Sequence, residues 1–215
     1  MTQATRVPQE ERTRLMRARL LEAAVEVLVE RGFANTTTTL VSERAGVSRG
    51  AQLHHFPTRN DLVFAAVEHV MTTRGAELAA AAEALPTGSS RTRAVLQLFA
   101  DHFTSPMFTA ALELWVGART DPSLLALVGP LEQQMGRSAH RLAVRLLEVD
   151  ESVPGQRELV QATLDLIRGL GLASTISADT RRRNRILDHW ATVLDAEIRV
   201  SAPRNPASGP AKGDS

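Results

Sequence analysis

One segment, residues 38–55, restricts the fold of this chain more than any other. It contains two short helical stretches, 38–45 and 48–55, which are separated by Gly46 and Val47. A glycine can take the positive φ that a tight turn between two helices requires, at little steric cost. Ser48 can then cap the second stretch by accepting a hydrogen bond from a backbone N–H. Two short helices joined by such a turn are typical of a helix-turn-helix.

The rest of the chain also predicts helices, because Ala, Leu, Arg and Glu dominate and alternating strand patterns are missing. We therefore expect an all-α protein of about nine helices. Beside the two short ones, we expect a helix over 13–31, which Gly32 ends as a left-handed cap, and a helix from Thr58 to about Leu85, with Thr58 and Asp61 as a capping box. Further helices are expected through Val95–Phe103, from Ser105-Pro106, and from Asp121-Pro122, where Pro130 kinks or restarts the segment. The last two expected helices are 156–176 and 180–199.

Composition and charge set only broad limits on the function. The net charge is +1, and residues 1–60 hold nine arginines against six glutamates, so the excess of positive charge is mild. The chain contains no cysteine, which excludes disulfides and thiolate metal sites and suits a cytoplasmic protein. No run of 18 apolar residues is present, so we expect no membrane partner.

The polar residues around the turn have a common explanation if the second short helix enters the major groove of DNA. Leu53 and Phe56 would anchor that helix in the core, while Arg49 can pair with guanine N7 and O6. The candidates for contacts to bases are Thr39, Ser48, Arg49, Gly50, Ala51 and His54. The candidates for contacts to phosphates, which lie at helix starts or flanks, are Arg17, Thr37, Thr38, His55 and Arg59.

Residues 18–64 resemble the DNA-binding domain of the TetR family of bacterial transcriptional regulators. The similarity lies in "LLEAAVEVLVERGFANTTT" and "AGVSRGAQLHHFPTRNDL", two ordered motifs with the glycine turn between short helices. The chain departs from the family where Gln52 and Leu53 replace an apolar residue followed by tyrosine. The phenol that would hold a phosphate is absent, so its role would pass to His54, His55 or Arg59.

The resemblance implies a homodimeric regulator, most often a repressor, that binds a pseudo-palindromic double-stranded operator and responds to a small, largely apolar effector. Together with the residue patterns, it predicts four parts: a flexible N-terminal arm (1–12), a helix-turn-helix domain (13–57), a helical effector-binding and dimerisation domain (58–200) and a disordered tail (201–215). It also implies that the two closing helices pair with those of a second copy. The helix-face residues expected at that interface are Leu159, Thr163, Leu166, Leu170, Ile186, Trp190, Val193 and Leu194. Packing within one subunit is the alternative for these residues.

An effector pocket would be lined mainly by apolar side chains with few polar anchors. The candidates are Phe99, His102, Phe103, Met107, Phe108, Leu112, Trp115 and Met135, with His102 as a possible polar anchor. Aromatic and methionine stripes at helical spacing also occur in an ordinary core, so this alternative stays open.

Other functions find less support in the sequence. Metal binding by His54 and His55 is disfavoured because adjacent side chains on a helix point about 100° apart, and no carboxylates accompany them. Four arginines near the N-terminus allow two interpretations: they form a basic arm that contacts DNA, or they belong to a frayed terminus in solvent. These residues are Arg6, Arg12, Arg14 and Arg17. No nucleophile elbow, Walker loop or dinucleotide fingerprint occurs, so we expect no catalytic residue, metal or cofactor. A small-molecule-binding protein or enzyme with a vestigial DNA-binding head remains the alternative.

Overall fold

The computed structural model describes residues 9–201, and the side chains of residues 70, 74 and 199–201 are not described. Within this range the chain forms nine α-helices, one short 3₁₀-helix and no strand, which confirms the all-α prediction. The helices are α1 (Gln9–Asn35), α2 (Thr38–Ala45), α3 (Arg49–His55), α4 (Arg59–Glu83), η1 (Gly88–Ser90), α5 (Arg91–Phe103), α6 (Pro106–Ala118), α7 (Pro122–Leu147), α8 (Gln156–Ser174) and α9 (Thr180–Ser201).

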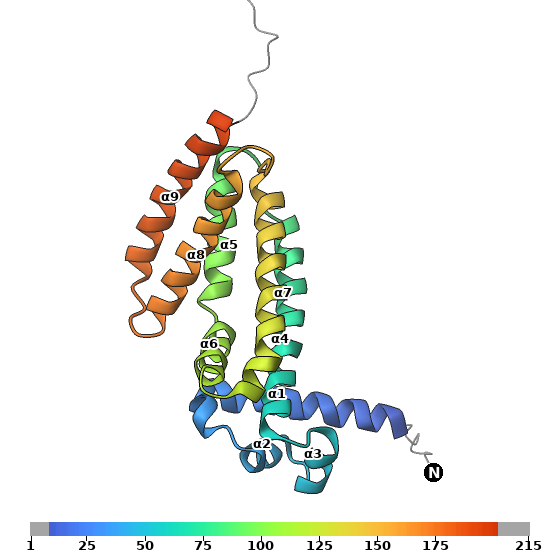
Figure 1. Ribbon diagram of the computed structural model, residues 1–215. Helices are drawn as coiled ribbons and strands as arrows, with labels where there is room; N and C mark the ends of the chain where they lie inside the picture. The colour runs from blue at the N-terminus through green and yellow to red at the C-terminus, as the bar shows by residue number, and fades with distance from the viewer. Residues whose placement is uncertain (1–8, 202–215) are drawn as a thin grey trace, which may run out of the picture.

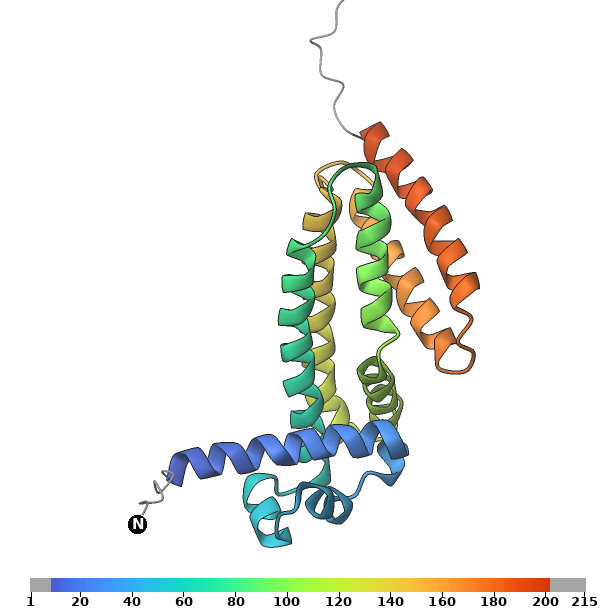
Figure 2. The same ribbon diagram turned by 180° about the vertical axis from the view of Figure 1, so that it is seen from behind.

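The molecule has a small head and a long helical body (Figure 1). Helix α1 lies across the foot of the body, with α2 and α3 below it, as the view from behind also shows (Figure 2). Helices α4 and α7 run along the length of the body, α5 lies in its part away from the head with α6 nearer the head, and α8 and α9 flank the body on one side. Helix α4 is the element that begins beside α3 and continues into the body.

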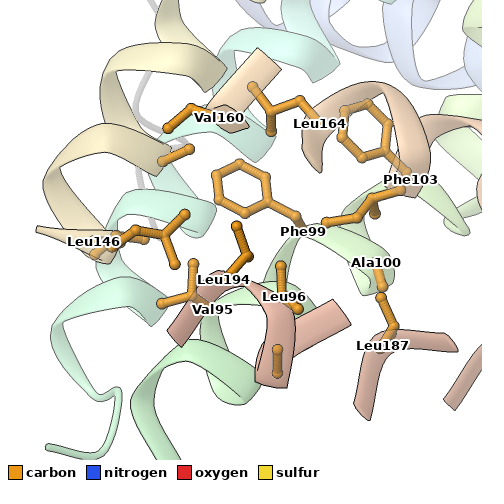
Figure 3. Packing of buried hydrophobic residues seen from close by; sticks show 14 of the residues in the cluster. Val95, Leu96, Phe99, Ala100, Phe103, Leu146, Val160, Leu164, Leu187 and Leu194 are labelled. Atoms are coloured by element: carbon orange, nitrogen blue, oxygen red, sulfur yellow. The ribbon is translucent and has the colours of Figure 1, made fainter. Parts of the chain in front are cut away.

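Each part has its own apolar core. In the head, α1, α2 and α4 bury residues such as Leu20, Val41 and Leu62 around Phe56. In the body, Phe99 and Leu96 of α5 pack among side chains of α7, α8 and α9 (Figure 3). A third cluster joins the end of α1 to α4, α6 and the start of α7. Head and body are therefore connected by continuous packing.

The capping signals in the sequence mark real helix starts. Ser48 accepts a hydrogen bond from the Ala51 N–H at the start of α3. Thr58 and Asp61 cap each other's backbone N–H groups at the start of α4, which confirms the capping box. Asp121 caps α7 through the N–H groups of residues 123 and 124.

Two helix predictions were wrong in detail, and one of two alternatives for a third is excluded. Helix α1 begins at Gln9, so residues 9–12 belong to it and not to an arm; residues 1–8 and 202–215 lie outside the described residues. Gly32 has φ 73° and ψ 168°, so its φ is positive but it is not a left-handed helical cap. Pro130 lies inside α7, which continues through it without a restart. Among the described residues, no helix combines the length and the hydropathy of a membrane span.

Candidate DNA-binding surface and ligand cavity

The turn between α2 and α3 has the geometry that the sequence predicts. Gly46 has φ 64° and ψ 38°, and its N–H bonds to the Glu43 carbonyl. Arg19 of α1 reaches the same turn and donates to the Ala45 carbonyl at 2.5 Å. A side chain at residue 46 would be strained by the positive φ and would meet the Arg19 guanidinium at 3.1 Å. The turn is thus fixed from both sides.

The prediction that Leu53 anchors α3 in the core was wrong. Leu53 is 43% exposed, whereas Gln52 is completely buried beside the buried Phe56. The Gln52 Nε2 donates to the Phe56 carbonyl at 2.7 Å, which stabilises the end of α3 from inside. The inward position is therefore taken by an amide, whose NH2 group is paired locally while its buried Oε1 has no hydrogen-bond partner among the described residues. Leu53 becomes part of the outer surface.

The base-contact candidates lie together on the outer side of the head. Ser48, Arg49, Gly50 and His54 are exposed, and Ala51 is half-buried. No atom lies within 4 Å of the position that a Cβ at Gly50 would take, so this part of α3 is open. Thr39 is exposed on α2. On α3 this surface presents the Arg49 guanidinium and the Ser48 hydroxyl at the helix start. The small residues Gly50 and Ala51 allow a second molecule to approach closely.

Four of the five phosphate candidates lie at two places, the start of α2 and the surroundings of Phe56. Thr37 is exposed and caps α2, and Thr38 is half-buried at the first turn of that helix. Arg17 is exposed on α1, with its guanidinium 5.4 Å from the centre of the Phe56 ring. His55 is half-buried, and burial, followed by the nearby His54 and Arg17, lowers its pKa below the usual value. The lowered pKa favours the neutral form of the His55 ring.

The fifth phosphate candidate, Arg59, occupies a different position from the expected one. Its Nε donates to the Thr36 carbonyl at 2.5 Å, and its Nη2 donates to the Phe33 carbonyl. The guanidinium also lies 4.0 Å from the centre of the Phe33 ring. Burial lowers the pKa of Arg59, against the effect of Asp121. The side chain thus holds the α1–α2 loop to the start of α4.

A contact between head and body was not predicted from the sequence. The backbone N–H of Phe33 donates to Glu113 Oε2 of α6 at 3.2 Å. The Phe33 ring lies against Gly117, where a Cβ would come within 2.5 Å of the ring. Asn60 of α4 donates to Asp121 at 2.9 Å. Hydrogen bonds from Ser123, Leu124 and Asn60 to the Asp121 carboxylate lower the pKa of Asp121 to about 2. The sequence signals near this contact were the Gly32–Phe33 turn close to the end of α1 and the helix start at Asp121.

The body contains a cavity of about 440 Å³ between α4, α5 and α7. Of the predicted pocket residues, Phe99, His102 and Met135 line it. Phe103, Met107, Phe108 and Trp115 instead line a small adjoining cavity of about 40 Å³, which shares His102 and Met135 with the larger one. Leu112 lines neither cavity and packs against the body core. The volume of the larger cavity lies within the range of about 300–1,000 Å³ that small-molecule sites have.

The adjoining cavity contains a charged pair that the sequence did not reveal. Arg168 Nη1 lies 3.4 Å from Glu132 Oε1, and the guanidinium lies 5.5 Å from the centre of the Phe103 ring. Burial raises the pKa of Glu132, against the lowering effect of Arg168. The pair links α7 to α8 across the aromatic part of the body.

The predicted dimer residues divide into two sets. Thr163, Leu170 and Leu194 are buried within their own subunit, so for these three the alternative of intramolecular packing holds. Thr163 Oγ1 accepts a hydrogen bond from Trp190 Nε1 at 3.0 Å, which joins α8 to α9. The other predicted residues are half-buried on the surface of the same two helices; they are Leu159, Leu166, Ile186, Trp190 and Val193. Nearby on the chain, Leu172 is 54% and Ile176 is 91% exposed.

A helical body carrying a helix-turn-helix head of this geometry defines a DNA-binding transcriptional regulator, and comparison with known proteins specifies the family. The family model for the bacterial regulatory proteins of the tetR family matches residues 20–66. An HTH-type transcriptional regulator of Mycobacterium tuberculosis is 33% identical over 144 residues, which cover 64% of this chain and 70% of the relative. The regulator CymR of Pseudomonas putida is 35% identical over 116 residues, 54% of this chain and 57% of the relative. The chain belongs to the TetR family of transcriptional regulators.

Solved structures show the same fold over most of the chain. A putative transcriptional regulator from Pseudomonas aeruginosa PAO1 aligns with a TM-score of 0.65 and 23% identity, covering 92% of this chain and 97% of its own. A putative regulator from Saccharomonospora viridis in complex with choline aligns with a TM-score of 0.64 and 17% identity, covering 86% and 96%. The multidrug binding protein EbrR complexed with imidazole aligns with a TM-score of 0.61 and 23% identity, covering 88% and 98%. At these identities the similarity concerns the fold.

Proposed function

We propose that the protein is a homodimeric repressor that a small, largely apolar effector releases from a pseudo-palindromic operator. The observation that carries this proposal is the outer face of α3, where Arg49 and Gly50 are exposed beside an open approach. In a two-fold dimer, two such helices would enter successive major grooves about 34 Å apart. Because its target would be chromosomal DNA, we place the protein in the cytoplasm.

The proposed roles follow the positions of the side chains. Arg49 would read guanine, and Ser48, Gly50, Ala51, His54 and Thr39 would lie along the groove. Arg17, Thr37 and Thr38 would contact phosphates, since they lie at the rim of the same surface. His55 would donate there through a ring N–H, and Arg59 is withdrawn from this set because carbonyl groups of the chain engage its guanidinium.

The cavity in the body supports the proposal of an effector. It lies between α4 and α7, and the first turns of these two helices are joined by the hydrogen bond from Asn60 to Asp121. A ligand that prefers one arrangement of these helices would change the position of α4 and hence the spacing of the heads. Two proteins of the same fold are described with small molecules bound, choline and imidazole.

Binding to the DNA that precedes the protein's own gene tests this function. We expect the full chain to prefer this DNA over a random duplex of equal length at physiological salt. Replacing Arg49 by alanine should reduce that preference by roughly 5- to 150-fold, because a bidentate contact to guanine contributes about 1–3 kcal/mol of discrimination. The control is Arg185→Ala, which removes an exposed arginine of α9 far along the chain from the head. Equal affinity for both duplexes would overturn the proposal and favour a small-molecule-binding protein with a vestigial head.

A further inference from the structure

The larger cavity in the body has an unequal distribution of charge along its wall. The apolar part of the wall includes the buried Phe99 and half-buried leucine, methionine and alanine side chains from α4 and α7. The polar part includes His102, Ser138, Arg141 and Arg145, and no carboxylate belongs to the lining. The wall therefore combines apolar surface with positive charge only.

The two arginines are placed to act together. Ser138, Arg141 and Arg145 are spaced i, i+3 and i+7 on α7, so they share one face of this helix. Both arginines are exposed, at the open side of the cavity. Arg141 Nη2 donates to Ser138 Oγ at 3.1 Å, which uses one of its five N–H groups. Within residues 9–201, neither guanidinium forms an ion pair with a carboxylate of the protein.

The acidic side chains near the cavity are engaged elsewhere. Glu132 lines the small adjoining cavity and faces Arg168 at 3.4 Å. Glu77 and Asp101 line a neighbouring groove of about 190 Å³ between α4 and α5, and Asp101 accepts a hydrogen bond from Gln97 at 2.6 Å. A cationic ligand in the larger cavity would thus have two guanidinium groups beside it and no carboxylate in the wall. An anionic ligand would be attracted by the same two guanidinium groups and would meet no carboxylate in the wall.

We infer that the effector is an amphiphilic anion, with an apolar body against Phe99 and Met135 and a carboxylate between Arg141 and Arg145. This inference rests on the proposed function in one respect, namely that the ligand of this cavity is the effector. Guanidinium groups bind carboxylates through charge-assisted hydrogen bonds of fixed geometry. The apolar wall contributes affinity that does not depend on charge, so the arginines decide which head group is accepted.

Three probes with one body and different head groups test the inference on the full chain. They are decanoate, 1-decanol and decylammonium, and their affinities are measured by isothermal titration calorimetry. We expect decanoate to bind about tenfold more tightly than decylammonium, since exposed ion pairs contribute up to about 1 kcal/mol each. Raising the salt concentration should reduce this preference, because the arginines are exposed and salt screens their charges.

The double variant Arg141→Gln/Arg145→Gln isolates the role of the two arginines. It should lose about tenfold in affinity for decanoate and keep the affinity of the wild type for decanol. The matched control is Arg137→Gln, which changes an exposed arginine of the same helix that does not line the cavity. Glutamine retains the helical propensity of arginine, so all three chains should fold alike, which circular dichroism verifies.

The outcomes separate this inference from the proposed function. The inference is overturned if decylammonium binds as tightly as decanoate, if the double variant keeps full affinity for decanoate, or if none of the three probes binds. Operator binding is measured in parallel without any probe. If the chain shows no preference for its own upstream DNA but still prefers decanoate, the proposed function fails. The cavity would then still be a site for an anionic ligand, but this ligand would not be an effector.

Discussion

Arg59 and Gln52 show how single side chains set the shape of the head. The Gln52 amide is buried and pairs with the Phe56 carbonyl, which leaves Leu53 and His54 on the outer side of α3. Arg59 satisfies the carbonyl groups of Phe33 and Thr36, which lie at and beyond the end of α1. The Phe33 carbonyl also accepts the Thr36 N–H at 3.2 Å, so the Thr36 carbonyl depends more on Arg59, and leaving such a group unpaired is costly.

Replacing Arg59 by methionine should therefore destabilise the protein. Methionine keeps much of the apolar stem but removes both hydrogen bonds, and we expect a loss of about 1–3 kcal/mol in the free energy of unfolding. Urea unfolding followed by circular dichroism measures this change, with Arg49→Met as the control on the exposed face. If Arg59→Met unfolds like the wild type but binds every duplex more weakly and with a smaller salt slope, then Arg59 contacts phosphates after all.

At the scale of elements, α1 and α6 form a close junction between head and body. Phe33 bonds to Glu113 through its backbone and lies against Gly117 through its ring. A second junction links the capped starts of α4 and α7 through Asn60 and Asp121. Each junction joins a helix of the head, or the helix that leaves it, to a helix near the cavity. A shift of α6 or α7 would therefore act on α1 and on the start of α4, which carry the head.

Replacing Gly117 by alanine should disturb the first junction. The new Cβ would come within 2.5 Å of the Phe33 ring, so the ring or α6 must move. We expect a loss of about 1–3 kcal/mol in stability, as is usual for overpacking, together with weaker operator binding. The control is Gly136→Ala in α7, where no atom lies within 4 Å and alanine should stabilise the helix by about 0.5–1 kcal/mol. Thermal unfolding and fluorescence anisotropy with labelled DNA measure the two effects, and identical behaviour of both variants would contradict this role of Gly117.

At the scale of the whole molecule, α8 and α9 leave an apolar strip on the outer side of the body. The strip consists of Leu159, Leu166, Ile186, Trp190 and Val193, all half-buried in one subunit. Thr163, Leu170 and Leu194 support it from beneath. In the proposed dimer a second copy would cover this strip through the same helices, because two-fold interfaces use the same surface on both partners.

Substituting Leu166 and Val193 together by aspartate should convert the proposed dimer into single chains. Two unpaired carboxylates would be buried at the interface in each copy, which is strongly unfavourable. Light scattering after size exclusion measures the mass, and operator affinity should fall with it because the two heads would no longer be held together. Leu125→Asp, at a 53% exposed position of α7, is the control. A wild-type mass of one chain would contradict the dimer.

Local signals gave most of the element boundaries. Gly46, Ser48, the Thr58–Asp61 box and Asp121 act within a few residues along the chain, and each occurs where the sequence predicts it. The side-chain directions were harder to predict. Leu53 was expected inside and is exposed, whereas Arg59, expected to contact phosphate, is half-buried with its guanidinium on carbonyl groups of the chain. These choices depend on groups from distant elements, which sequence spacing does not specify.

The sequence by itself determined the order of the helices, most of their caps, the helix-turn-helix and the family, because these depend on short-range hydrogen bonds, backbone preferences and ordered motifs. Only the tertiary structure decided that Gln52 rather than Leu53 faces the core of the head from α3. It also decided that Phe33 contacts α6 and that Arg141 and Arg145 border the same cavity. Such features arise where helices distant in sequence pack together, and the free energy of that packing is shared among side chains that no local pattern connects.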